Sequence, residues 1–172
     1  FRILDRVNRA LPGWERHVVP WPTERDIHNL ITATPQHFFF TEEEERFGNH
    51  QRRNMGIPDG ADFICFHARD CAYLDTAISS ENWHYHDFRD SRIQAYSPAA
   101  LELASRGYFM VRMGAIVKEP LNIDNPMVID YAVRFRSDFL DIYLLAKCSF
   151  FICSLTGIAE VAKIFRKPVL WI

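Results

Sequence analysis

The sequence predicts an α/β protein built around a mostly parallel β-sheet. From residue 59 onward, short apolar runs alternate with segments of helical pattern. An apolar run without polar alternation is typical of a strand that is covered on both faces, as strands in parallel sheets are. Capping residues and glycines separate the segments. Because strands and helices alternate, the pattern predicts crossover helices between parallel strands and therefore a Rossmann-like domain.

The predicted elements follow one another at short intervals. Thr41 is expected to cap a helix in the charged stretch 41–57, and the run FICF begins the first strand at residue 63. Ser97 is expected to cap the next helix, with a proline in its first turn and a glycine after its end. The remaining elements are a strand at 108–114, a helix from Ser137 or Asp138 to 148, a strand at 149–154, a helix at 157–165 and a strand at 168–172.

Length and composition limit the chain to one large core. With 172 residues and 48% hydrophobic content, one domain with an additional segment is the natural division. Residues 1–58 are interrupted by prolines and are expected to be an interdomain segment or the tail of a preceding domain. Residues 59–172 are expected to form the Rossmann-like domain, truncated at its C-terminal end within a strand. We therefore expect the chain to be a piece of a longer protein.

Charge and cysteine usage exclude several classes of protein. The formal net charge is −2, and the 20 basic residues are scattered among 22 acidic ones, so the whole chain offers no electrostatic case for binding nucleic acid or an anionic membrane. No apolar run approaches the roughly 20 residues of a transmembrane helix. The four cysteines lack CxxC spacing and are expected to be reduced thiols in a cytoplasmic protein: Cys65, Cys71, Cys148 and Cys153.

Polar residues follow two predicted strands directly. His67, Arg69 and Asp70 end the first strand, and Ser154, Thr156 and Gly157 connect a later strand to a helix. Ligands of open α/β sheets collect at the carboxyl ends of the strands. A tight turn at a helix N-terminus also offers backbone N–H groups to a phosphate, although the same residue types serve as ordinary caps. The two strand ends together predict an anionic ligand.

Two further strand-end residues allow two interpretations each. Asp70 would act as a general base toward an acceptor hydroxyl, or it would simply form an ion pair with Arg69. Arg112, at the end of the strand YFMV, would join the phosphate site or lie solvated at its rim.

The stretch NWHYHDFRDSR suggests an alternative chemistry. An H-x-H pair followed by carboxylates binds a transition metal when the residues share one face of a strand. A metal-dependent phosphoesterase or hydrolase would then use His67, Asp70, His84, His86 and Asp87. A polar loop near an acceptor is the competing interpretation, because no second ligand set at metal spacing is evident. We expect no metal ion and no other cofactor.

The motifs FHARD and SDFLDIYLLAKCSFFICSLTGIAEVA resemble those of the fucosyltransferase superfamily. In that superfamily an H-x-R strand end and a later D-I-x-x-L, strand and C-T-x-S-S turn hold GDP-fucose. YHDFRDS, RGYFMVRMG and RSDFLDIYLLAKC resemble, more closely, uncharacterised bacterial glycosyltransferases associated with surface carbohydrate. The likeness covers roughly residues 60 to 172. It implies the C-terminal, nucleotide-sugar half of a GT-B glycosyltransferase.

The resemblance also implies a role for each matching residue. His67 would approach the nucleotide, and Arg69 would grip the β-phosphate and stabilise the leaving diphosphate. Asp141 would accept hydrogen bonds from guanine, although an acidic residue in the first turn of a helix needs no such explanation. Thr156 and Gly157 take the places of the paired serines, and Gly157 lacks the hydroxyl.

The expected function is therefore an inverting, metal-independent transfer of a sugar to a surface glycan. The donor would be a GDP-linked sugar, with fucose as the sugar that the superfamily suggests. The enzyme would be cytoplasmic, at the inner face of the membrane, and the 172 residues alone would bind the donor but transfer little sugar. The other hypotheses are the metal-dependent hydrolase and a nucleotide-binding module without catalysis.

Overall fold

A computed structural model describes residues 2–17, 29–77 and 83–172. The chain divides into two compact units, Phe1–Thr34 and Pro35–Ile172. The boundary lies earlier in the chain than the expected one at 58/59. The physical reason is that the helix expected before residue 58 contacts Tyr143 of the second unit, and that Met55 and Ile57, which follow this helix, belong to the core of that unit.

The described residues of the first unit, 2–17 and 29–34, form short helices. They are α1 (Arg2–Arg9), the 3-10 helix η1 (Trp14–His17) and α2 (Leu30–Ala33). No helix in the described parts of either unit is long and apolar enough to cross a bilayer.

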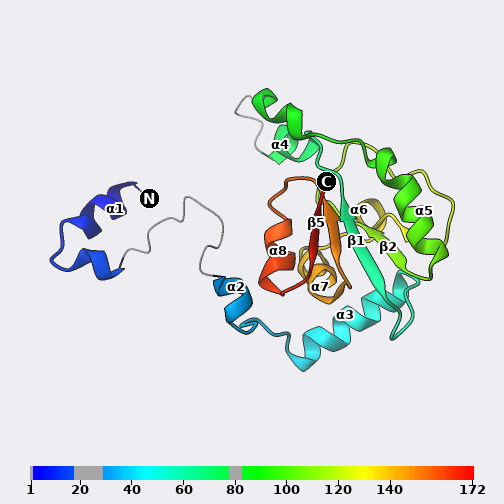
Figure 1. The fold of residues 1–172 in the computed structure, drawn as a ribbon, viewed down its shortest axis with the longest axis horizontal. Helices are drawn as coiled ribbons and strands as arrows, with labels where there is room; N and C mark the ends of the chain where they lie inside the picture. The colour runs from blue at the N-terminus through cyan, green and yellow to red at the C-terminus, as the bar shows by residue number, and fades with distance from the viewer. Residues whose placement is uncertain (1, 18–28, 78–82) are drawn as a thin grey trace. The chain divides into compact units, whose positions relative to one another are not determined.

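The second unit is built on a five-stranded sheet in which every pairing is parallel (Figure 1). This confirms the predicted α/β class and the Rossmann-like arrangement. In spatial order the strands are β3 (Val128–Ile129), β2 (Phe109–Arg112), β1 (Phe63–His67), β4 (Phe151–Cys153) and β5 (Val169–Trp171).

The strand order reverses beside β1. From β1 the chain adds β2 and then β3 on one side, and it continues with β4 and β5 on the other side. His67, at the end of β1, is in register with Cys153, at the end of β4, so the two strands end level with each other. The loops after β1 and β4 therefore leave the sheet at a topological switch point, where open α/β sheets bind ligands.

Helices cover both faces of the sheet (Figure 1). Alternate residues of β1 point to opposite faces, since Phe63 and Cys65 belong to one apolar cluster and Ile64 and Phe66 belong to the other. The first cluster includes residues of α7 (Asp138–Lys147) and α8 (Ala159–Ile164), and the second includes residues of η3 (Ile93–Tyr96) and α5 (Ser97–Ser105). The other helices are α3 (Glu42–Asn54), α4 (Ala72–Ala77), η2 (His84–Arg89) and α6 (Tyr131–Arg134).

Two of the predicted helix starts are confirmed and one is wrong. Thr41 and Glu44 form a capping box at the start of α3, and the Ser137 hydroxyl accepts from the Leu140 N–H at the start of α7. Ser97 lies within the first turn of α5 rather than capping it, because η3 runs directly into α5 and Tyr96 takes the cap position.

The sequence prediction missed strand β3. Two residues are too short to produce a recognisable pattern, so β3 is defined only by its pairing with Met110 and Val111 of β2. The short helices α4 and α6 were missed for the same reason.

Gly48 brings α3 close to α7. A Cβ atom at residue 48 would lie 2.3 Å from the Tyr143 ring, which is fully buried and has no room to move. The Tyr143 hydroxyl lies 3.1 Å from Glu45 Oε2 and 3.2 Å from Asn49 Oδ1, three residues before and one residue after the glycine. Burial, followed by the hydrogen bond to Glu45, raises the pKa of Tyr143 to about 12, so this hydroxyl keeps its proton at neutral pH.

We expect Gly48→Ala to lower the free energy of unfolding by about 1 to 3 kcal/mol, because overpacking against Tyr143 outweighs the higher helix propensity of alanine. Urea denaturation followed by circular dichroism measures the change. Gly157→Ala is the matched control, since a Cβ atom there meets nothing within 4 Å. Equal stabilities of the two variants would show that α3 does not depend on this contact.

Candidate functional site

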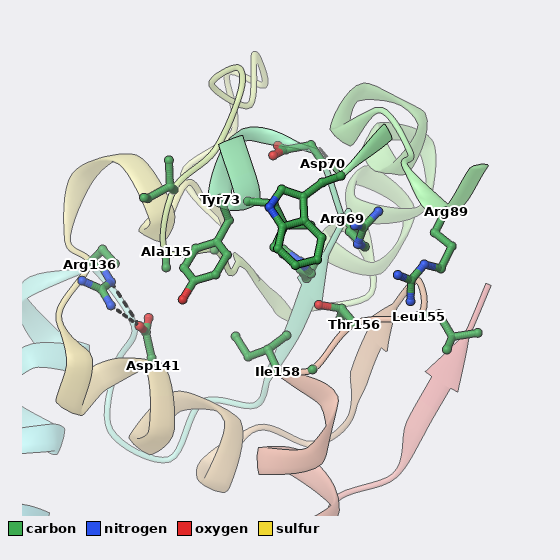
Figure 2. Close-up of a pocket in the computed structure, with 16 residues that line it drawn as sticks. Arg69, Asp70, Tyr73, Arg89, Ala115, Arg136, Asp141, Leu155, Thr156 and Ile158 are labelled. Carbon is green, nitrogen blue, oxygen red and sulfur yellow. Dashed lines mark hydrogen bonds and ion pairs between the residues drawn. The ribbon is translucent and has the colours of Figure 1, made fainter. Parts of the chain in front are cut away.

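A cavity of about 620 Å³ opens at the carboxyl edge of the sheet. Its lining comes from the loops after β1, β2 and β4 and from the start of α7, which meet at the switch point. In Figure 2, Arg69, Arg89 and Thr156 lie toward one end of the cavity and Arg136 and Asp141 lie toward the other. The cavity therefore has a basic end and an end that holds a carboxylate.

His67 brings a neutral imidazole to the cavity. Its Nδ1 lies 3.0 Å from the Met113 carbonyl oxygen, and since a carbonyl only accepts, Nδ1 carries the hydrogen and Nε2 is the acceptor. Burial is the main cause that lowers the pKa of His67, against the opposing effect of the bond to Met113. Gly114, which follows Met113, has a φ of +155°, and a Cβ atom there would lie 2.6 Å from a side-chain carbon of Val117, so the loop after β2 requires glycine at this position.

Arg69 is held from two sides. Its backbone N–H donates to Ser154 Oγ at 3.0 Å, which joins the loop after β1 to the loop after β4. Its guanidinium forms an ion pair with Asp90, and both side chains are largely shielded from solvent. Burial raises the pKa of Asp90, an effect that the charge of Arg69 opposes. The ion-pair partner of Arg69 thus lies 21 residues away in the sequence.

Both carboxylate oxygens of Asp70 accept hydrogen bonds from backbone N–H groups. Oδ1 accepts from the Ala72 N–H at 3.0 Å at the start of α4, and Oδ2 accepts from the Lys118 N–H at 3.0 Å. Asp70 lines the cavity, but these bonds favour a role in fixing two loops over the predicted role as a general base. The other interpretation, an ion pair between Asp70 and Arg69, is wrong, because Asp70 bonds to backbone N–H groups and Arg69 pairs with Asp90.

The turn after β4 contributes Thr156 and Gly157 to the cavity. Within the described residues, the backbone N–H groups of these two residues donate to no carbonyl or side chain, so both are available to a ligand. Ser154, predicted to face the ligand, is buried, and its hydroxyl oxygen accepts from Arg69. Its role is therefore to position the loop of Arg69. The helix that follows, α8, is short, so its dipole adds little to the site.

Asp141 lies in the cavity wall, where its carboxylate already has partners. Its Oδ1 lies 2.8 Å from the Tyr131 hydroxyl, and its Oδ2 accepts from Arg136 Nη2 at 2.9 Å and from Nε at 3.1 Å. Each carboxylate oxygen has two lone pairs, so a ligand donor can still be accommodated. Any donor that approaches Asp141 must share it with Arg136 (Figure 2).

The position of Arg112 contradicts both sequence-based interpretations, a phosphate contact and a solvated rim residue. Arg112 is buried, with 1% of its surface exposed, so it is not a solvated rim residue. Its Nη1 lies 3.0 Å from Asp130 Oδ1, and its Nη2 donates to the Glu119 carbonyl at 3.0 Å, so the guanidinium is used inside the protein and does not join the phosphate site. Asp130 also accepts from the Leu121 N–H at 2.8 Å. This buried ion pair fastens the long connection between β2 and β3.

The alternative metal site gains no support from the described side chains. Among them, no group of three or more histidine, cysteine, aspartate or glutamate residues lies close enough to hold a metal ion. The side chains of His84 and His86 lie outside the part of the chain that the structure describes. His67 and Asp70 lie in the cavity wall, and Asp87 is exposed.

The prediction missed several residues of the site. Arg89, Arg136 and the aromatic residues Tyr73 and Trp83 line the cavity, and Asp90 holds Arg69. Arg136 directly precedes the predicted helix cap Ser137, which is a signal that was present in the sequence. The others lie in or beside the short helices α4 and η2, and the sequence pattern there has no period from which their positions could be inferred.

Comparisons with known proteins add no assignment. No protein family matches the chain, and no curated protein or solved structure matches it either. The class that the structure defines is a Rossmann-like α/β domain with a ligand-sized cavity at its switch point.

We expect Asp130→Asn to lower the free energy of unfolding by about 3 kcal/mol, because it leaves the buried Arg112 without a carboxylate. Glu102→Gln is the control, because it removes the acidic partner of Arg106 from an exposed ion pair. Exposed ion pairs contribute little to the free energy of unfolding. Urea denaturation of both variants is the measurement. A loss of less than about 1 kcal/mol for Asp130→Asn would contradict a structural role for the Arg112 pair.

We also expect acidification to destabilise the protein through His67. The pKa of His67 is lower in the folded protein than the ordinary 6.5, so as the pH falls the unfolded chain binds this proton before the folded protein does. The free energy of unfolding therefore decreases as the pH falls below about 6.5. Unfolding free energies at about pH 7.5 and about pH 5.5 should differ less in His67→Asn than in the wild type. His37→Asn, at an exposed histidine, should retain the wild-type difference.

Proposed function

We propose that the second unit binds a nucleoside diphosphate sugar and is the donor half of a GT-B-type glycosyltransferase. The observation that carries the proposal is the meeting of Arg69, Arg89 and the turn of Thr156 and Gly157 at one end of the switch-point cavity. Diphosphates require permanent positive charge and backbone N–H donors at one place. The cavity volume, about 620 Å³, suits a ligand of this size.

The opposite end of the cavity suits the base of such a ligand. Asp141 and Arg136 offer an acceptor and donors to a base, and Tyr73 lies on the wall between the two ends (Figure 2). A nucleoside diphosphate has the same order of chemistry, with a hydrogen-bonding base at one end and two anionic groups at the other. The resemblance to fucosyltransferases implies a GDP-linked donor, because a carboxylate can accept from guanine N1 and N2 together.

In this proposal each residue has a defined task. Arg69 stabilises the charge that gathers on the diphosphate as the glycosidic bond breaks, so its effect is larger in the transition state than in the ground state. Asp90 keeps the guanidinium in place, and a guanidinium with five donors can contact a phosphate while paired. Because Nδ1 of His67 donates to Met113, its Nε2 accepts a hydrogen bond from the ligand in this proposal. The transfer would invert the anomeric centre, with fucose as the candidate sugar and a surface glycan as the acceptor.

We expect Arg69→Ala to weaken GDP binding by about 2 to 4 kcal/mol, which is roughly thirtyfold to a thousandfold, and to leave guanosine binding nearly unchanged. Asp141→Asn should do the reverse and reduce the preference for GDP over UDP, because an amide offers only one acceptor. Calorimetric titrations of guanosine, GDP and UDP measure both effects. Arg106→Ala, on the exposed surface of the second unit, is the control for loss of an arginine.

Three outcomes would contradict this proposal. If the wild type binds no nucleoside diphosphate, the donor-site assignment is wrong. If a folded Arg69→Ala variant binds GDP as tightly as the wild type, Arg69 serves only its ion pair with Asp90. If binding requires a divalent metal and is lost in EDTA, the metal-dependent hydrolase becomes the better hypothesis.

A further inference from the structure

Helix α1 of the first unit carries an exposed apolar face. The exposed fractions of Ile3, Leu4 and Val7 are 77%, 70% and 57%, and that of Leu11, just after the helix, is 56%. Leu4 and Val7 are one and four residues from Ile3, which places these three side chains along one side of the helix. Single exposed aliphatic residues are ordinary, but three on one side of an eight-residue helix, with exposed Leu11 just after it, indicate a surface that binds something apolar. We call Ile3, Leu4, Val7 and Leu11 the apolar stripe.

The opposite side of α1 is polar and basic. Arg6 and Arg9 lie on it and are exposed, and Arg9 Nε donates to Asp5 at 3.0 Å. Residues 2–17 contain four arginines and two acidic residues, a net charge of +2, whereas the whole chain has −2. The rest of the chain therefore carries −4, and the positive charge is concentrated beside the apolar stripe.

Trp14 follows this helix and stays near its basic side. The Arg9 guanidinium lies 4.8 Å from the centre of the Trp14 ring, and the indole is half-buried. Tryptophan is enriched at the boundary between lipid headgroups and acyl chains. An apolar stripe, basic residues opposite it and a neighbouring tryptophan together match a helix that lies flat in a membrane interface.

We propose that α1 binds reversibly to the surface of an anionic lipid bilayer. Ile3, Leu4, Val7 and Leu11 enter the boundary of the acyl chains, and the arginines attract the anionic headgroups. The charge selects this occupant over a second copy of the chain, because two copies would bring the same positive segment together. Eight helical residues span only about 12 Å, so α1 adsorbs to the membrane without crossing it.

Co-sedimentation of the full 172-residue chain with lipid vesicles tests the proposal. The chain should bind vesicles that contain about 25% phosphatidylglycerol at least threefold better than vesicles of phosphatidylcholine alone. Raising the salt from about 0.1 M to about 0.5 M should remove most of this difference, since the Debye length shortens. The same measurement without lipid, by sedimentation velocity, reports any self-association.

Matched variants separate the apolar stripe from the charge. Leu4→Asp should weaken binding at least tenfold, whereas Leu101→Asp, at an exposed leucine of α5, should leave it unchanged. Arg6→Glu should weaken binding to anionic vesicles about tenfold, whereas Arg46→Glu, at an exposed arginine of α3, should have little effect. The altered side chains are exposed, so all four variants are expected to stay folded, and circular dichroism checks this.

Each contrary result overturns the membrane assignment. Equal binding to both kinds of vesicle would show that anionic headgroups are not recognised. Undiminished binding by Leu4→Asp and Arg6→Glu would show that α1 is not the lipid-binding element. Self-association that Leu4→Asp abolishes, without vesicle binding, would assign the apolar stripe to a second copy. None of these results depends on nucleotide binding by the second unit.

Discussion

The central strand β1 is buried on both faces, and the second unit is arranged around this constraint. A strand in the middle of a parallel sheet needs a helical layer on each side. Phe63 and Cys65 are covered on one face, and Ile64 and Phe66 are covered on the other. With both faces occupied, only the ends of β1 reach solvent. The polar residues that follow β1 therefore lie at the edge where β4 also ends, and the cavity forms there.

Three arginine–aspartate pairs border this edge, and they differ in how far water reaches them. The pair of Arg112 and Asp130 is buried and anchors a connection inside the fold. The pair of Arg69 and Asp90 is partly shielded and lines the cavity through its arginine. The pair of Arg136 and Asp141 is the most accessible of the three at its arginine, and both partners line the cavity. The same kind of ion pair thus anchors the fold at one end of this series and lines the cavity at the other.

The predicted elements with a clear apolar period or cap were confirmed, as β1, α3 and α7 illustrate. Strand β3 was missed because two residues carry no period, and Ser97 was taken for a cap because η3 cannot be distinguished from a loop by pattern. His67, Arg69 and Thr156 line the cavity, and the sequence singled them out because each lies at or just after the end of a recognisable strand. Arg89 and Asp90 were missed because they lie in a stretch without apolar period.

The sequence by itself determined the α/β class, the parallel character of the sheet and the polar strand ends, because each follows from local apolar period and local capping. Only the tertiary structure decided which charges meet. Arg69 follows β1 and Arg112 is the last residue of β2, yet one lines the cavity and the other is buried against Asp130. The difference arises because the connection between β2 and β3 brings the Glu119 carbonyl and Asp130 to the Arg112 guanidinium. The pairing of charged groups distant in the chain is a property of packing, and no local pattern encodes it.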